Sequence, residues 1–222
     1  MARIRGVILD VDGTLVDSND AHAKAWIAAM AENGYRIPFE AVRKLIGMGG
    51  DKLLPLTINV EEKSPIGKRI GKRRKEIFMK EHLPRLFPTP GAEELLAELS
   101  QRGWRMVVAS SATEEELTPL LRRCRADWFI ESKTSSDDAE NSKPDPDIIH
   151  AALGRLKMPP GDALMLGDTP YDIEAAGRAG VKTVAFRCGG WKDDGLKGAI
   201  AVYDGPADLL ARFDGSPFAR KG

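Results

Sequence analysis

Two aspartates separated by one residue, Asp10 and Asp12, follow a short apolar run that covers residues 4–9. Side chains at positions i and i+2 leave a strand on the same side, so we expect the two carboxylates to share one small volume. In such an arrangement one carboxylate can act as a nucleophile while the other donates and accepts a proton. Gly13, which comes next, allows the chain to turn sharply at this point.

Three further segments carry groups suited to phosphate chemistry. Ser110 and Ser111 follow an apolar stretch, where a hydroxyl can donate a hydrogen bond to a phosphoryl oxygen. Lys143 stands before a proline and a helical pattern, and its ammonium can neutralise a phosphoryl group as a point charge. Asp168 and Asp172 follow another apolar stretch and add two more carboxylates.

A metal ion is the simplest way to bring these acidic side chains together. Four carboxylates, those of Asp10, Asp12, Asp168 and Asp172, would repel one another strongly in one small volume. A hard divalent cation would compensate them, and oxygen-rich, partly hydrated ligation suits Mg²⁺. The sequence therefore predicts Mg²⁺ as the cofactor.

The elements that must position these residues alternate between strands and helices over most of the chain. Apolar runs predict strands at 4–9, 104–109, 128–130, 163–166, 181–186 and 200–203. Helical periodicity predicts helices at 91–102, 113–123, 145–156, 171–179 and 206–213. This alternation indicates an α/β fold with a Rossmann-like parallel sheet between two helical layers, a three-layer αβα core.

The first strand is separated from its expected sheet partners by about 70 residues with helical patterns. These predict helices at 19–32, 39–45, 51–54 and 68–81, with Asp17 and Ser18 as N-cap residues of the first helix. We therefore predict a catalytic core formed by residues 1–15 and 87–222, and an inserted helical cap formed by residues 16–86. Ligands bind at the carboxyl ends of parallel strands, so the cap would lie over the site as a lid.

The chain resembles the haloacid dehalogenase superfamily of hydrolases in four motifs that occur in order along it. They are Asp10-Val11-Asp12-Gly13-Thr14-Leu15, the strand-end Ser110, Lys143-Pro144, and Gly167-Asp168-x-x-x-Asp172. The helical insertion is similar to the first cap type of that superfamily, which phosphoglycolate phosphatases and β-phosphoglucomutases share. The resemblance covers essentially the whole chain.

The resemblance implies a role for each motif residue. Asp10 would attack phosphorus to form an aspartyl-phosphate, and Asp12 would protonate the leaving alkoxide and then activate water. Ser110 and Lys143 would hold the phosphoryl oxygens. The groups expected to position Mg²⁺ are all from aspartates: Asp10, the backbone carbonyl of Asp12, Asp168, and Asp172 through a water.

Further residues are candidates for contact with the substrate. Ser111, Thr14 and His22 are predicted to bind it. His22 is included because similar phosphatases and mutases often carry a histidine at this position. The glycine-rich turn at 46–50 is best interpreted as the part of the cap that faces the substrate. A basic stretch at 68–75 is expected to form a solvated helix face.

The predicted function is hydrolysis of a small soluble phosphomonoester. A sugar-phosphate mutase of the same family is the alternative, although the turn at 46–50 lacks the cation that would bind a second phosphate; Arg43 and Lys44 just before it leave that alternative open. From another class, a phospho-accepting receiver-like domain would need only one phosphorylated aspartate and no large insertion. Asp12 argues against a dehalogenase, which needs no second aspartate at that place.

Composition excludes several other classes. The chain has 222 residues with 33 Lys plus Arg and 33 Asp plus Glu, so it lacks the basic excess of a nucleic-acid binder. No apolar run approaches the roughly 20 residues that a membrane helix needs, and the run at 7–9 is too short for a signal peptide. The 2 cysteines indicate a reducing compartment. We expect a cytoplasmic monomer or homodimer that binds neither nucleic acid nor membrane.

Overall fold

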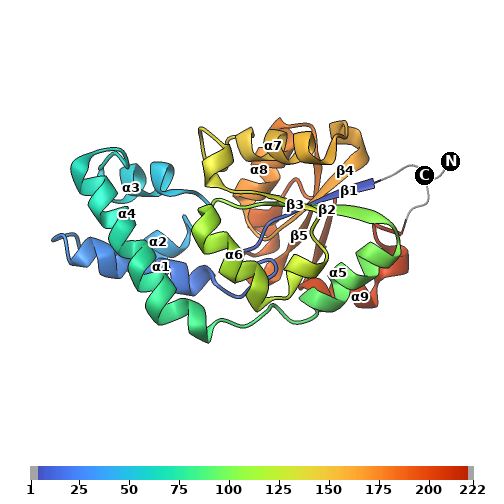
Figure 1. The fold of residues 1–222 in the computed structure, drawn as a ribbon, viewed down its shortest axis with the longest axis horizontal. Helices are drawn as coiled ribbons and strands as arrows, with labels where there is room; N and C mark the ends of the chain where they lie inside the picture. Colours follow the sequence, from blue (N-terminus) through green and yellow to red (C-terminus); the bar gives the residue numbers. More distant parts are fainter. Residues whose placement is uncertain (1–4, 220–222) are drawn as a thin grey trace.

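The computed structural model describes residues 5–219 and has a parallel β-sheet at its centre (Figure 1). The sheet has six strands in the order β3-β2-β1-β4-β5-β6, and every neighbouring pair is parallel. The strands are β1 (Arg5–Leu9), β2 (Trp104–Ala109), β3 (Ser132–Thr134), β4 (Ala163–Gly167), β5 (Lys182–Phe186) and β6 (Ala201–Tyr203). The predicted α/β fold with a parallel sheet is confirmed.

The first strand of the chain lies in the middle of the sheet. β1 pairs with β2 on one side and β4 on the other, with Val7 opposite Met106 and Leu164. Val7 and Leu9 pack into one hydrophobic cluster, whereas Ile8 between them packs into a second cluster. Alternate side chains of β1 are therefore buried on opposite faces, which is why its sequence is a continuous apolar run.

Helices cover both faces of the sheet, as Figure 1 shows. On the face of Ile8 lie α7 (Asp147–Leu156) and α8 (Pro170–Arg178). On the opposite face lie α5 (Ala92–Gln101), α6 (Glu114–Arg123) and α9 (Pro206–Ala211). α6 has three glutamates in its first turn and two arginines in its last, a charge order that favours a helix at both ends.

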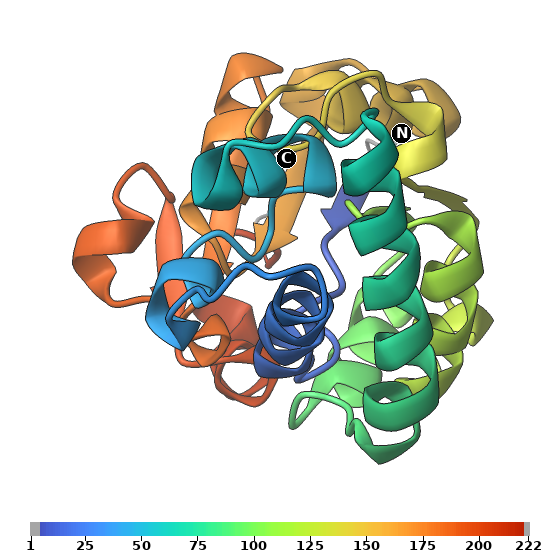
Figure 2. The same cartoon turned by 90° about the vertical axis from the view of Figure 1, so that its left-hand side faces the viewer.

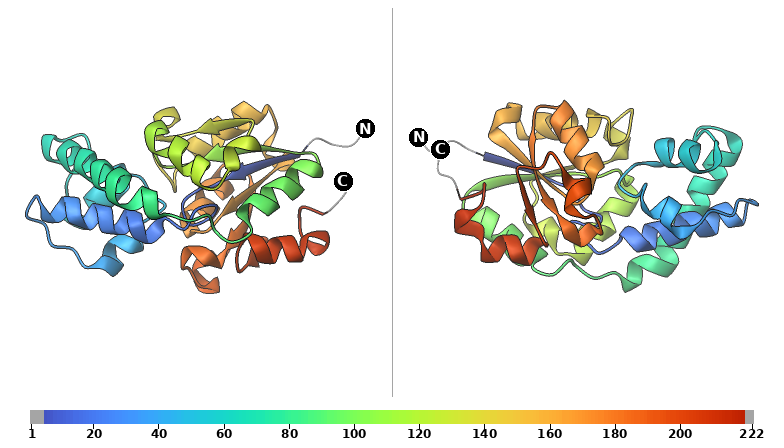
Figure 3. Two further views of the ribbon diagram at one scale, coloured as in Figure 1. Left: turned by 60° about the horizontal axis from the view of Figure 1, so that its bottom comes forward. Right: turned by 180° about the vertical axis from the view of Figure 1, so that it is seen from behind.

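A helical segment lies between β1 and α5 in the sequence. It comprises α1 (Asn19–Ala31), α2 (Phe39–Arg43), α3 (Gly50–Ile58) and α4 (Pro65–Ile77), followed by a π-helical turn at Phe78–His82. Figure 2 looks onto this segment, and both views of Figure 3 place it beyond one end of the sheet. That end carries the carboxyl termini of the strands, because β1 runs directly into the segment.

The two connections between the helical segment and the sheet run side by side. The backbone N–H of Asp17 donates to Phe87 O at 3.1 Å, and the N–H of Thr89 donates to Leu15 O at 2.9 Å. Val16 and Pro88 face each other across this antiparallel pair. The outgoing and returning chains are thus joined to each other.

Some predicted elements differ from the structure. The strand predicted at 128–130 is wrong: Ala126–Trp128 is a short 3₁₀ helix, Trp128 is 83% exposed, and the edge strand is the polar β3. α4 begins three residues earlier than predicted, because the Ser64 hydroxyl accepts a hydrogen bond from Gly67 N at 3.1 Å and Pro65 occupies the first turn. Ile4, the predicted start of the first strand, lies outside the described residues. Within residues 5–219, no helix has the length and apolar character needed to span a membrane.

Candidate active site

The sheet topology brings the predicted polar residues together. Asp10 directly follows β1, Ser110 follows β2 and Asp168 follows β4. β1 lies between β2 and β4, so these three residues leave three adjacent strands at the same edge. Lys143 reaches them from the segment before α7, and Asp172 from the first turn of α8.

Lys143 holds its ammonium group among three oxygen atoms. Its Nζ donates to Asp10 Oδ1 at 2.7 Å, to Asp172 Oδ1 at 2.7 Å and to Ala109 O at 2.8 Å. Lys143 is only 1% exposed, and burial acts to lower the pKa of its ammonium. The two carboxylates outweigh that effect and raise the pKa above its usual value, so the side chain stays charged.

Asp168 is held on both of its oxygens. Thr14 Oγ1 donates to Oδ1 at 2.9 Å, and Asn19 Nδ2 donates to Oδ2 at 2.8 Å. Burial, followed by repulsion from Asp10 and Asp172, raises the pKa of Asp168 well above its ordinary value. Burial also raises the pKa of Asp10 to about 7, against the opposing charge of Lys143. The site therefore contains more negative charge than its single lysine compensates.

Three buried carboxylates, those of Asp10, Asp168 and Asp172, form a group that could hold a divalent metal ion. One oxygen from each lies within 4.8 Å of the others. Oxygen donors of this kind suit a hard cation, and the raised pKa values of Asp10 and Asp168 reflect repulsion and burial that a cation would relieve. The residues present therefore fit a divalent metal.

Asp172 uses its two oxygens for protein contacts. Oδ1 accepts from Lys143, and Oδ2 accepts from the Thr169 backbone N–H at 3.0 Å and the Thr169 hydroxyl at 2.7 Å. Thr169 and Asp172 form a reciprocal capping box at the start of α8. Asp172 thus orients Lys143 while it caps a helix.

Asp12 lies near Asp10, but its carboxylate points toward the helical segment. Its Oδ1 accepts a 2.5 Å hydrogen bond from the Ser18 hydroxyl and lies 2.8 Å from His22 Nε2. Burial acts to raise the pKa of Asp12, but His22 and Ser18 together lower it below its ordinary value. The prediction that Ser18 caps α1 with its side chain is wrong, because the carboxylate takes the hydroxyl instead.

A small cavity separates these aspartates from the helical segment. It has a volume of about 40 Å³ and is bordered by Asp10 and Asp12, and by His22, whose ring stacks on Phe78 at 3.9 Å. The other lining residues come from the turn at 46–49, the loop after β2, α1 and α4: Ile46, Gly47, Met48, Gly49, Ser111, Ala112, Trp26 and Arg74. The turn predicted to face the substrate thus lies over the aspartates.

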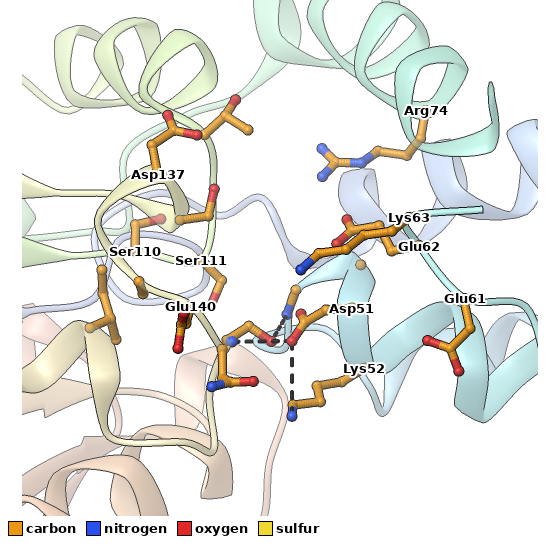
Figure 4. Close-up of a pocket in the computed structure, with 18 residues that line it drawn as sticks. Asp51, Lys52, Glu61, Glu62, Lys63, Arg74, Ser110, Ser111, Asp137 and Glu140 are labelled. Carbon is orange, nitrogen blue, oxygen red and sulfur yellow. Dashed lines mark hydrogen bonds and ion pairs between the residues drawn. The ribbon is translucent and has the colours of Figure 1, made fainter. Parts of the chain in front are cut away.

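A wider cleft of about 680 Å³ lies between the helical segment and the core. Ser110 and Ser111 lie at one side of it, and in Figure 4 Arg74 and Lys63 point into it from the other. The Ser110 hydroxyl oxygen accepts from Ala112 N at 3.1 Å, and the Ser111 hydroxyl donates to Gly47 O at 3.1 Å. Thr14, by contrast, is fully buried between Asp10 and Asp168, which favours a positioning role.

Sequence reasoning missed several residues of the site. Sequence patterns do not single out Asn19, and they place Arg74 on a solvated basic face, whereas Arg74 pairs with the buried Glu116 of α6 and lies over the Trp26 ring. The pairing of Thr169 with Asp172 could have been found from the Thr-x-x-Asp pattern of a capping box. Nothing in the local sequence marks Asn19, whose partners Asp168 and Gly189 lie 149 and 170 positions away. Glu116 accepts from the Thr113 hydroxyl three residues before it, but no local pattern reveals its pairing with Arg74, 42 positions away.

Known proteins resemble the chain over most of its length. Residues 7–186 match the model of a family described as haloacid dehalogenase-like hydrolase. A protein of Caldanaerobacter subterraneus named as a pyrophosphatase, PpaX, is 31% identical over 83% of the chain and 82% of its own length. A phosphoglycolate phosphatase of Pseudomonas savastanoi is 31% identical over 82% of the chain and 69% of its own length. The crystal structure of a hydrolase from Pseudomonas syringae superimposes with a TM-score of 0.88 at 28% identity, covering 95% of this chain and 98% of that one.

Proposed function

The chain belongs to the haloacid dehalogenase-like hydrolases, and on that premise we propose that this phosphatase hydrolyses a small soluble phosphomonoester through an aspartyl-phosphate on Asp10, with Mg²⁺ as its cofactor. One observation carries the proposal. Asp10 lies at the centre of the strand-end cluster, with the Lys143 ammonium 2.7 Å from one oxygen and the small cavity in front of it. A carboxylate placed beside a fixed cation and an open volume is suited to attack a phosphoryl group that the cation holds.

Lys143 and Ser110 are the proposed ligands of the transferring group. Lys143 is fixed by Asp172 and Ala109 O, so its charge is oriented before a substrate arrives. Preorganised charge of this kind stabilises the developing charge of a phosphoryl transition state without reorganisation. Ser110 lies at the adjacent strand end and borders the cleft, where its hydroxyl can donate to a phosphoryl oxygen.

Asp12 is the proposed general acid and base. Its carboxylate borders the same cavity as Asp10 and lies 2.8 Å from His22 Nε2, which orients it. Asp12 would give a proton to the leaving alkoxide and later accept one from the attacking water. His22 therefore acts on Asp12 and need not contact the substrate.

Asp10, Asp168 and the backbone carbonyl of Asp12 are the proposed Mg²⁺ ligands, with Asp172 acting through a water. Bound there, the cation would neutralise charge on the phosphoryl oxygens as the nucleophile approaches. Thr14 supports this arrangement because its hydroxyl contacts both Asp10 and Asp168, at 3.4 Å and 2.9 Å.

We also propose the division into a core of residues 1–15 and 87–222 and a cap of residues 16–86. Residues 1–4 and 220–222 of the proposed core lie outside the described range. The paired connections at Leu15–Asp17 and Phe87–Thr89 support a boundary there. Closure of the cap would exclude water while Asp10 is phosphorylated.

Hydrolysis is favoured over the mutase reaction by the surroundings of Arg43 and Lys44. Arg43 binds Gly189 O at 2.6 Å and Asp20 at 2.7 Å, and the carbonyl of Lys44 accepts from Tyr171. Among the described residues, neither borders the small cavity. A second phosphate near Asp10 would therefore find no cation from this turn.

A panel of phosphate esters tests the proposal: phosphoglycolate, hexose phosphates, nucleotides, pyrophosphate and p-nitrophenyl phosphate, each with Mg²⁺ and with EDTA. We expect turnover of at least one monoester with Mg²⁺ and none with EDTA. Asp10→Asn should reduce turnover by about 1,000-fold or more, since it removes the nucleophile. Asp194→Asn, which changes an exposed aspartate, is the matched control. Absence of turnover on the whole panel, or a wild-type rate in Asp10→Asn, would contradict the proposal.

A further inference from the structure

Asn19, the first residue of α1, is buried beside the carboxylate cluster although it belongs to the helical segment. It is 2% exposed. Its Nδ2 donates to Asp168 Oδ2 at 2.8 Å and to the backbone carbonyl of Gly189 at 3.3 Å. One side chain of the helical segment thus contacts the loop after β4 and the loop after β5.

The orientation of the Asn19 amide is fixed by its partners. Asp168 and the Gly189 carbonyl are both acceptors, so only the NH₂ end of the amide can face them. Turning the amide around would place its oxygen against two other oxygens. Asn19 is therefore a donor to Asp168 at this position.

Two glycines enclose the same oxygen of Asp168. A Cβ built on Gly13 or on Gly189 would overlap Asp168 Oδ2, and one on Gly13 would also overlap Asn19 Nδ2. Oδ2 is thus surrounded by Asn19 and by two backbone segments that carry no side chain. Its position is determined by close packing as well as by the hydrogen bond.

The other oxygen of Asp168 faces the cluster. Thr14 Oγ1 contacts Asp168 Oδ1 at 2.9 Å and Asp10 Oδ2 at 3.4 Å, so Oδ1 lies on the side of Asp10. Asn19 holds the far oxygen and leaves the near one available to a cation. An outer partner that orients a ligating carboxylate in this way commonly affects metal affinity.

From this geometry we infer that Asn19 is a positioning residue for the metal ligand Asp168, and that it couples metal binding to the placement of α1. The inference rests on the proposed metal site. Metal binding at Asp168 Oδ1 strengthens the arrangement in which Asn19 holds Oδ2, and movement of α1 away from the core removes that hold. By linkage, the metal then stabilises the docked position of α1 to the same extent.

The test compares Asn19→Ala and Asn19→Leu with the parent protein. Leu has the same branching and the same number of side-chain heavy atoms as Asn but no donor, so the comparison of Leu with Ala separates loss of the hydrogen bond from loss of packing. We expect Mg²⁺, titrated calorimetrically into the metal-free protein, to bind roughly 10- to 100-fold more weakly to both variants. The matched control is Asn33→Ala, which removes an amide at the other end of the same helix, where Nδ2 donates to Ala29 O at 2.8 Å.

Two further measurements separate positioning from a purely structural role. A structural role lowers the melting temperature equally with and without Mg²⁺, whereas positioning makes the Mg²⁺-induced rise smaller in the Asn19 variants than in the parent. Hydrogen exchange in peptides covering the start of α1 should slow on Mg²⁺ addition in the parent and change little in Asn19→Ala.

The outcomes are distinct. Parent and Asn19 variants that bind Mg²⁺ with equal affinity would overturn the inference and leave the proposed function standing. A parent protein that binds no Mg²⁺ would overturn both. If Asn33→Ala weakens Mg²⁺ binding as much as the Asn19 variants do, the inference about Asn19 is also overturned, since the effect would then belong to the helix as a whole.

Discussion

Lys143 brings a full positive charge to a place that water does not reach. Such a charge is stable only because two carboxylates and a carbonyl surround it at hydrogen-bond distance. The carboxylates depend on the lysine in return. Substitution of Lys143 or of either carboxylate should therefore change the stability of the protein, and this change can be measured apart from any loss of activity.

We expect Lys143→Met to lower the free energy of unfolding of the metal-free protein by about 3 kcal/mol or more, because it leaves buried carboxylates without their counter-charge. Urea unfolding in EDTA measures this. The double variant Asp10→Asn/Lys143→Met should recover part of the loss, since it removes one of the uncompensated charges. If the double variant is less stable than Lys143→Met alone, the lost free energy of unfolding comes from packing and the electrostatic explanation is wrong.

The raised pKa of Asp10, about 7, predicts a pH dependence of stability in the metal-free protein. Folded Asp10 and Asp168 bind protons that the unfolded chain, with carboxyl pKa values near 4, has already lost. Between about pH 4 and pH 7 the folded state thus binds more protons, so stability falls as pH rises through this window.

Thermal unfolding in EDTA should therefore give a melting temperature several degrees lower at pH 7.5 than at pH 5, and Mg²⁺ should remove most of the difference. Asp10→Asn, which cannot titrate, is the control and should show a smaller decrease. A melting temperature that rises over this range in EDTA would contradict the assignment of raised pKa values.

The sequence predicted which residues meet, but not how each carboxylate points. Asp10, Ser110 and Asp168 were placed correctly at one sheet edge because strand order and direction follow from topology. The direction of Asp12 was not predicted, because Ser18 can either cap α1 or bond a carboxylate. In the structure the Ser18 hydroxyl donates to the Asp12 carboxylate at 2.5 Å, and the backbone N–H groups of the first turn of α1 receive no side-chain cap from Ser18.

At the scale of elements, apolar periodicity predicted the central strands and the helices that cover them. It failed at β3, where the sequence Ser132–Thr134 is polar because the strand lies at the sheet edge. Of the apolar residues just before it, Trp128 is 83% exposed, whereas Phe129 and Ile130 pack partly buried against the hydrophobic core without forming a strand. Apolar periodicity therefore does not locate a polar strand at the edge of a sheet.

Glycines within single elements give a matched pair of substitutions. Gly189→Ala should weaken Mg²⁺ binding and destabilise the protein, because its Cβ would overlap Asp168. Gly154→Ala in α7 meets no atom within 4 Å and should stabilise by roughly 0.5–1 kcal/mol through helix propensity. Urea unfolding and Mg²⁺ titration measure both. Equal effects of the two substitutions would mean that Gly189 is not needed for the Asp168 site.

At the scale of the whole molecule, oppositely charged side chains from distant parts of the chain pair with one another. Three of the six basic residues at 68–75 form ion pairs: Arg73 binds Glu32 of the helical segment, while Arg74 and Lys75 bind Glu116 and Glu115 of the core. On the other side of the cleft, Lys52 binds Asp145 at 2.7 Å. The pairs of Arg74, Lys75 and Lys52 connect the helical segment to the core.

Glu115 and Glu116 provide adjacent tests of that contact. Glu116 has a side chain that is 1% exposed, so Glu116→Gln should destabilise by roughly 1–3 kcal/mol and speed hydrogen exchange in α4. Glu115, 72% exposed, forms a solvated pair, and Glu115→Gln should change stability by at most about 0.5 kcal/mol. A Glu116→Gln variant with unchanged exchange in α4 would show that the pair does not hold the segment.

The central position of β1 has a consequence for biosynthesis. β1 leaves the ribosome first, yet its neighbours β2 and β4 begin only at Trp104 and Ala163. At translation rates of about 5–20 residues per second, it waits roughly 8–30 s for the second of them. Until β2 emerges both edges of this apolar strand are unpaired, and one edge stays unpaired until β4 emerges, while the helices that follow β1 can already form from local contacts. Nascent chains stalled before Ala163 should therefore be more prone to aggregation, and more dependent on chaperones, than chains stalled after β4.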